Sequence, residues 1–151
     1  MTSHERSVFI TPWFEADRQS GIHLISDELF AQSVFPTRRN PSPRPFISVL
    51  SLPEWSLGSD LLDQIHVLGS VTKDLGLSGL KAAILVTENE HVRRCVEYNL
   101  GATPISGLTD AAISYLLADE GRVDELLARN SRLLGEAMDF CADWAEFHNF
   151  P

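Results

Sequence analysis

His91 and Cys95 are the pair of residues whose types and spacing come nearest to a metal site. They lie four positions apart in a stretch that is predicted to be helical, so both side chains share one face of the helix. A zinc site in a protein uses three or four such ligands, and no further histidine or cysteine completes the set at a suitable spacing. The sequence therefore predicts no metal site.

Residues for nucleophilic or acid-base catalysis are present without a diagnostic arrangement. No Gly-x-Ser-x-Gly turn occurs, and the serine, histidine and aspartate residues show none of the spacings of a hydrolase. The paired carboxylates Asp119-Glu120 and Asp124-Glu125 fall on polar helix faces and are interpreted as solvated charge. We therefore predict no catalytic residue and no cofactor, and we favour a non-enzymatic role.

Composition indicates a single globular domain. The chain has 151 residues, of which 44% are apolar and 22% are charged, so it can bury a core without a disulfide or a metal. A net charge of −9 argues against nucleic acid as a partner, because phosphate contacts need clustered cations. No apolar run approaches the roughly 20 residues of a membrane span, and no signal-peptide pattern opens the chain. A cytoplasmic protein is expected.

Two apolar runs, 46–52 and 81–87, would form the centre of the fold. Both are short and nearly continuous, and an amphipathic stretch predicted as a helix over 61–75 lies between them. This order is typical of buried parallel strands that are joined by a crossover helix. The proline-rich stretch 36–46 is predicted to be an extended loop. Further strands are predicted at 8–14, 22–25 and 102–106, with a short helix from Ser26 to about Val34.

Helix-ending residues delimit the remaining helices. Gly76 is predicted to close the helix over 61–75 in the left-handed conformation. Thr87 and Glu90 fit a capping box, and the helix that they begin would end at Gly101. Thr109-Asp110 is predicted to cap another helix, which runs to Leu117.

The last thirty residues show the spacing of a helical seam. Eight residues fall at alternating steps of four and three: Val123, Leu127, Asn130, Leu134, Ala137, Cys141, Trp144 and His148. This pattern predicts one long amphipathic helix. Two interpretations stay open, since the helix could fold over its own sheet or form the seam of a homodimer. The candidate interface residues are Leu127, Asn130, Leu134 and Trp144.

The predicted order of elements resembles the STAS fold of anti-sigma-factor antagonists and the STAS-like family that borders the CRAL-TRIO lipid carriers. The residues that carry this resemblance are 90–101, 103–105 and 108–116. It implies an α/β domain over 1–119 with a mixed sheet of four or five strands and helices packed on it. The amphipathic helix over 120–151 would pack on that domain or on a partner. The implied function is a regulatory module that binds a protein partner or a small apolar ligand.

The STAS resemblance also implies a phosphorylation switch. In that family a serine at the start of the helix after the central strand is phosphorylated. Ser59 takes this position here, and Ser56 is the neighbouring candidate. A helix N-terminus favours a phosphate, whereas Asp60 would repel one, so the alternative is that Ser59 is a plain N-cap.

A second resemblance is to GNAT acetyltransferases and the related acyl-homoserine-lactone synthases. Residues 61–101 are similar to their central helix, strand and helix, and 87–101 are similar to their "N…Y…LG" segment. This resemblance implies binding of acetyl-coenzyme A. Only Gly58 is available for a pyrophosphate-binding turn, and Glu54 and Asp60 lie beside it. The acyltransferase is therefore the alternative to the regulatory module.

Overall fold

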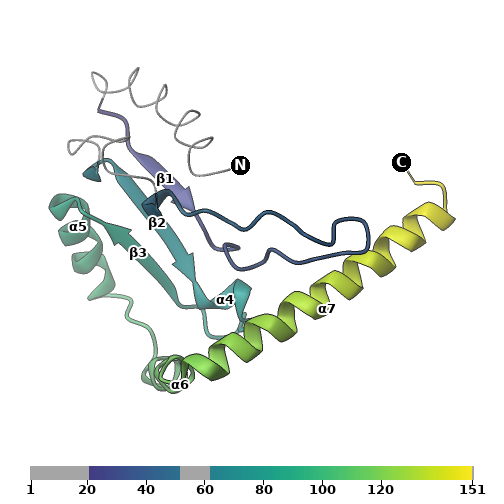
Figure 1. Ribbon diagram of the computed structural model, residues 1–151. Coiled ribbons are helices and arrows are strands. Elements are labelled where there is room, and N and C mark those ends of the chain that lie inside the picture. Colours follow the sequence, from purple (N-terminus) through teal and green to yellow (C-terminus); the bar gives the residue numbers. More distant parts are fainter. Residues whose placement is uncertain (1–20, 52–61, 151) are drawn as a thin grey trace.

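The computed structural model describes residues 21–51 and 62–150. Its elements are β1 (Leu24–Asp27), the 3-10 turn η1 (Val49–Ser51), β2 (Ile65–Ser70), α4 (Val71–Asp74), β3 (Ala83–Thr87), α5 (Glu90–Leu100), α6 (Gly107–Leu117) and α7 (Glu120–Phe147). The strands lie side by side, and α7 projects from them as a long arm (Figure 1). Among the described helices, none combines the length and the apolar character of a membrane span.

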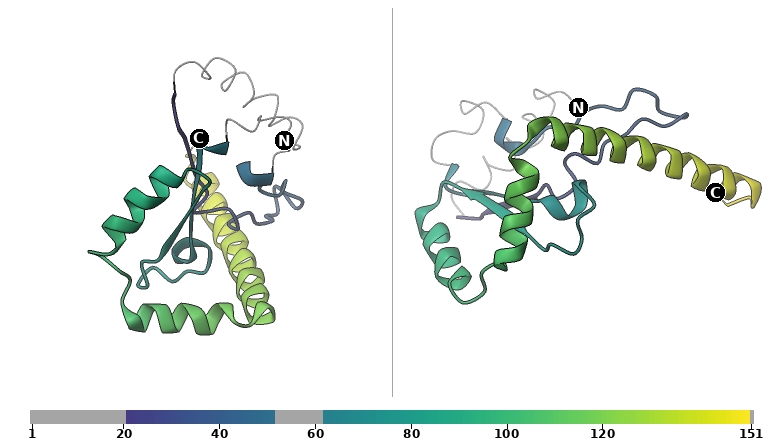
Figure 2. Two further views of the ribbon diagram at one scale, coloured as in Figure 1. Left: turned by 90° about the vertical axis from the view of Figure 1, so that its left-hand side faces the viewer. Right: turned by 90° about the horizontal axis from the view of Figure 1, so that it is seen from below.

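Strand β2 is the centre of a mixed sheet of three strands in the described ranges. It runs parallel to β1 and antiparallel to β3. Ile65 and Val67 on β2 are buried together with Val49, and Leu24 packs against them. In two further views α5 and α7 flank the strands on opposite sides, and α6 joins these two helices (Figure 2).

The α/β class and the mixed sheet are confirmed, but the predicted number of four or five strands is wrong for the described residues. The run 46–52 forms the turn η1 where it is described, because the N–H of Val49 donates to the carboxylate of Glu28 at 2.9 Å and not to a neighbouring strand. No strand forms at 102–106, since the N–H groups of Ala102 and Thr103 bind the last carbonyls of α5. The strand predicted at 8–14 lies outside the described residues.

The helix predicted over 61–75 is wrong for its main part, which is strand β2 followed by the single turn α4. A short apolar run is compatible with both the helical and the strand period. As an extended strand, β2 gains hydrogen-bonded partners on two sides. Ser70 then caps α4, because its Oγ accepts from the N–H of Thr72 at 2.9 Å. Gly76 has the predicted left-handed conformation, with φ of 67°, but it follows α4 and not a long helix.

Smaller corrections concern the helix ends. The predicted helix from Ser26 to about Val34 is a strand end followed by turns. Asn89 caps α5 in place of Thr87, and Ser106 caps α6 in place of Thr109. The long C-terminal helix is confirmed as α7, whose cap is Asp119, a residue that was interpreted as solvated charge.

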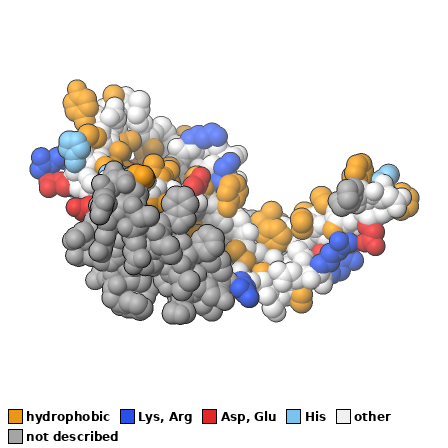
Figure 3. Space-filling view, turned by 90° about the horizontal axis from the view of Figure 1, so that it is seen from above, with side chains coloured by type: hydrophobic (Ala, Val, Ile, Leu, Met, Phe, Trp, Pro, Cys, Tyr) orange, Lys and Arg blue, Asp and Glu red, His pale blue; other side chains and the backbone are white. Residues whose placement is uncertain are grey.

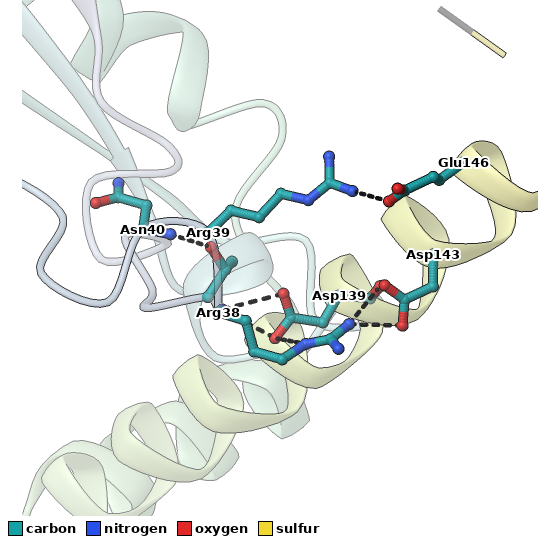
Figure 4. Close-up of polar contacts among 7 residues, drawn as sticks. Arg38, Arg39, Asn40, Asp139, Asp143 and Glu146 are labelled. Carbon is teal, nitrogen blue, oxygen red and sulfur yellow. Dashed lines mark hydrogen bonds and ion pairs between the residues drawn. The ribbon is translucent and has the colours of Figure 1, made fainter. Parts of the chain in front are cut away.

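The proline-rich stretch 36–46 is a loop, as predicted, and its residues 36–41 lie against α7. The guanidinium of Arg38 is 2.6 Å from the carboxylate of Asp143, and its backbone N–H donates to Asp139 (Figure 4). Asp143 raises the pKa of Arg38 above its ordinary value through this hydrogen bond and its charge. Arg39 pairs with Glu146 at 2.7 Å. We call residues 36–41 the strap.

Candidate active site

Three strand ends meet at one edge of the sheet. Asp27 closes β1 opposite Leu68 of the parallel strand β2, and Ser70 closes β2 opposite Ala83, where β3 begins. In open α/β sheets, ligands bind outside the carboxyl ends of parallel strands. The edge beyond Asp27 and Ser70 is therefore the candidate site.

Both lysines of the chain lie at this edge. Lys73 is on α4, directly after β2, and Lys81 lies two residues before β3 with a positive φ of 51°. Both side chains are exposed. The Nζ of Lys73 is 5.7 Å from the centroid of the Phe30 ring, in the turn after β1. An amine and an aromatic ring thus extend together from the ends of two parallel strands.

A carboxylate completes the set of functional groups at this edge. Asp27 is exposed, and its Oδ1 accepts a hydrogen bond from the N–H of Leu29 at 3.1 Å. That bond fixes the side chain at the start of the turn that carries Phe30. A carboxylate, a ring and two amines at one edge can bind a ligand that carries an aldehyde, a protonated ring nitrogen and an anionic group.

The opposite end of the strands holds a chain of hydrogen bonds through His66, which is 4% exposed. Its Nε2 lies 2.7 Å from Nδ1 of His23, and its Nδ1 lies 2.7 Å from Oγ1 of Thr87. The two imidazole rings are nearly parallel, at 11°. Burial, and secondly the charge of His23, lower the pKa of His66 below its ordinary value of 6.5. These contacts join β2 and β3 to the residue that precedes β1.

Acidification is expected to destabilise the fold through His66. Its folded-state pKa is depressed, so unfolded chains bind more protons once the pH falls to about 6.5. The contribution of His66 to the free energy of unfolding is complete above that pH. It is lost as the pH falls from there towards the folded-state pKa of His66. We expect the urea midpoint of the unsubstituted chain to drop more, between about pH 7.5 and about pH 5.5, than that of His66→Gln. Equal drops in both proteins would contradict this role.

The structure places the residues singled out in the sequence as follows. Ser56 and Ser59 lie outside the described residues. Leu127 is half-buried, whereas Leu134 and Trp144 are 41% and 51% exposed on α7. Asn130 bonds within the chain, to α4. The use of these residues as a homodimer interface stays a prediction. His91 and Cys95 are exposed on α5, and the described residues contain no cluster suited to a metal ion.

Comparison with known proteins shows which family this chain belongs to. The family model described as aminotransferase class I and II matches residues 14–148. The chain belongs to this aminotransferase family. Similar curated proteins include the probable aminotransferase aclI of Aspergillus oryzae, which is 33% identical over 131 residues and covers 85% of this chain.

Two further relatives of this aminotransferase-family chain are plant enzymes. The 1-aminocyclopropane-1-carboxylate synthase 5 of Oryza sativa subsp. japonica is 30% identical, and synthase 2 of Cucurbita pepo is 34% identical, each over 118 residues and 78% of this chain. The chain spans 21% and 22% of these two proteins and 30% of the Aspergillus protein. It thus spans less than a third of the length of the relatives that it matches.

Family membership overturns both resemblances drawn from the sequence. The STAS-like and GNAT assignments are wrong, and so is the function as a non-enzymatic regulatory module. Alternating strands and helices are shared by many unrelated families, so their order alone does not assign one. The stretch 61–75 misled the assignment further, because a predicted crossover helix occupied the place of β2 and α4.

Sequence reasoning missed Lys73 altogether. Within the predicted helix 61–75 it would be an ordinary polar surface residue. A usable signal was present, since the chain has only two lysines and both lie within residues 73–81, between the end of one strand and the start of the next. Recognising β2 as a strand would have placed both amines at a strand edge, where ligands bind.

Proposed function

We propose that this chain carries the lysine that binds pyridoxal phosphate in an aminotransferase-family enzyme, and that Lys73 is this lysine. Membership in the family supports the cofactor. Enzymes that use pyridoxal phosphate bind it covalently through a lysine amine, and the chain offers two lysines. The observation that carries the assignment is the place of Lys73, directly after β2 and beside the turn that follows β1.

The residues at the sheet edge fit this cofactor. Asp27 provides the kind of carboxylate that pairs with a pyridinium nitrogen. Phe30 provides an apolar face beside Lys73. Lys81 precedes β3, which lies on the other side of β2 from β1. It would supply a second cation for the phosphate group. The different places of the two lysines in the strand order support different roles for them.

Bound pyridoxal phosphate supplies an electron sink that stabilises a carbanion next to an amino nitrogen. The described residues of the chain would do the rest. Lys73 would hold the cofactor, and its Nζ is a group that could take up or return a proton there. Asp27 would pair with the protonated ring nitrogen, and the ring of Phe30 lies beside the amine of Lys73, 5.7 Å from its Nζ to the ring centroid.

A spectrophotometric titration tests the proposal. Pyridoxal phosphate is added to the 151-residue chain, which is then treated with borohydride and passed through a desalting column. We expect saturable binding and a chromophore that stays with the protein after reduction. Pyridoxamine phosphate is the control, since it has the ring and the phosphate but no aldehyde. Equal retention of the two compounds, or retention of neither, would contradict covalent binding.

Replacing Asp27 by asparagine is expected to weaken binding of pyridoxal phosphate by about ten- to a hundredfold, because a hydrogen bond between charged partners is worth about 1.5–3 kcal/mol. The asparagine keeps the shape of the side chain and removes its charge. Asp63→Asn is the matched control, since Asp63 is also exposed but precedes β2 at the opposite edge of the sheet. The dissociation constants are measured by the same titration. Equal values for both variants would remove Asp27 from the site.

We also propose that the arm formed by α7 mediates a homodimer. Its heptad seam continues to the end of the helix, and hydrophobic side chains lie exposed along the arm (Figure 3). Replacing Leu134 by aspartate would put a charge into an apolar seam, so we expect the sedimentation coefficient to fall from that of a dimer to that of a monomer. Asp124→Asn, on the same helix, is the control. A monomer before substitution would refute the dimer.

A further inference from the structure

We propose that Asp74 and Asn130 are positioning residues for Lys73, so that the long helix α7 fixes the direction in which this lysine points. The inference rests on the proposed function, because it takes Lys73 as the lysine that binds the cofactor. It concerns how a single helical turn is held at the edge of the sheet.

Asp74 joins the turn of Lys73 to the segment that follows β1. Its Oδ1 accepts from the hydroxyl of Ser33 at 2.7 Å, and its Oδ2 accepts from the N–H of Gln32 at 3.0 Å. Both oxygens of the carboxylate are therefore engaged. Because Gln32 and Ser33 follow Phe30 closely, these bonds also hold the aromatic ring near the Nζ of Lys73.

Asn130 joins the same turn to α7. Its Nδ2 donates to the backbone oxygen of Asp74 at 3.0 Å, across 56 residues of sequence. A Cβ on Gly76 would lie 3.9 Å from this Nδ2, so the amide lies close to the turn on this side as well. The polar residue of the seam on α7 thus contacts the α4 region of its own chain.

These contacts matter because α4 has only four residues. An isolated helical turn is unstable, so its orientation depends on its tethers. The peptide that carries the bonded oxygen of Asp74 begins one residue after Lys73. A rotation of this turn would be amplified at the end of the four-carbon side chain, and a displacement of about 1 Å at a reacting group can cost about a hundredfold in rate.

Substitutions of Asn130 separate a hydrogen bond from simple packing. Asn130→Asp keeps the size of the side chain but turns an acceptor towards the carbonyl of Asp74, whereas Asn130→Ala removes the donor. A packing role predicts that aspartate is harmless, and a hydrogen-bonding role predicts that it is at least as harmful as alanine. Asn99→Ala is the matched control, since its Nδ2 donates to the oxygen of Cys95 at 2.7 Å within α5.

The readout is the rate at which pyridoxal phosphate labels each lysine of the folded chain. The amine condenses with the aldehyde and releases water, and borohydride then adds hydride to the new bond to leave a stable secondary amine. Peptide mass spectrometry gives the adduct at Lys73 and at Lys81 in the same sample. Unfolding would make the two amines alike, so the ratio of their rates reports the orientation of Lys73.

We expect the ratio of labelling at Lys73 to labelling at Lys81 to fall about five- to tenfold in Asn130→Ala and Asn130→Asp, as for the loss of one net hydrogen bond. Asp74→Asn should lower it similarly, because an amide has one acceptor oxygen for two donors. Asn99→Ala should leave it unchanged. Circular dichroism checks that each variant is folded, and Asn130→Gln, which keeps the donor, should retain a higher ratio than Asn130→Asp.

Unchanged ratios in the Asn130 and Asp74 variants, with Lys73 still labelled in the unsubstituted chain, would overturn this inference and leave the proposed function intact. Labelling of Lys81 alone in the unsubstituted chain would instead overturn the proposed function.

Discussion

Replacing Lys73 by arginine is expected to abolish the covalent attachment of pyridoxal phosphate to this chain. Arginine keeps a positive charge on a long side chain, so the contact with the ring of Phe30 can persist. Its guanidinium stays protonated at all accessible pH values and cannot condense with an aldehyde as an amine does. The protein should therefore fold as before and retain no more chromophore after borohydride reduction than it does with pyridoxamine phosphate.

Lys81→Arg is the matched variant for this result. It leaves Lys73 as the single amine of a lysine side chain and keeps a cation before β3. We expect covalent attachment to persist in Lys81→Arg. The reverse outcome, attachment in Lys73→Arg and none in Lys81→Arg, would transfer the role to Lys81.

Replacing Gly135 by alanine is expected to separate the strap from α7. Gly135 is buried on the helix, and a Cβ there would collide with the backbone oxygen of Pro36. Alanine gains about 1 kcal/mol of helix propensity over glycine, whereas overpacking against a rigid group costs about 1–3 kcal/mol. The guanidinium of Arg38 is exposed, so its ion pairs with Asp139 and Asp143 contribute too little to outweigh this collision. The strap should move away from the helix.

Trypsin measures the release of the strap, because it cleaves after arginine and the strap contains Arg38 and Arg39. We expect cleavage there to be several-fold faster in Gly135→Ala than in the unsubstituted chain, as local opening becomes easier. Gly107→Ala is the control, since a Cβ at this first residue of α6 would meet open space. A strap that is cut at the same rate in both variants would show that the contact at Gly135 does not hold it.

Much of the second half of the fold could be predicted from the sequence. β3, α5, α6 and α7 were expected near their observed positions, because local signals specify them. The seam from Val123 to Trp144 repeats often enough to exclude a strand, and polar caps lie near the starts of α5 and α6.

The first half of the fold depends on contacts that the sequence does not show. β2 could be told from a helix only through its pairing with β1 and β3, and the burial of His66 depends on His23 and Thr87, far away in the chain. Glu28 likewise keeps Val49 out of a strand through one side-chain contact. Local periodicity cannot reveal such pairings.

The candidate site was missed for the same reason. Asp27 and Lys73 are separated by 46 positions and come to one edge only because β1 and β2 run parallel. The prediction of one helix over 61–75 removed that edge. Asn130 stands out in the sequence as a polar residue in an apolar seam. Its hydrogen bond to the backbone oxygen of Asp74 can be recognised only once α4 is known to lie beside α7.

The assignment of Lys73 is tested most directly by locating the covalent adduct. The unsubstituted chain is incubated with pyridoxal phosphate, reduced with borohydride, digested with a protease that does not depend on lysine, and mapped by peptide mass spectrometry. We expect the pyridoxyl group on Lys73. Lys81 should be modified only at the higher reagent concentrations that also label the unfolded chain. An adduct confined to Lys81, or equal modification of both lysines at every concentration, would contradict this assignment.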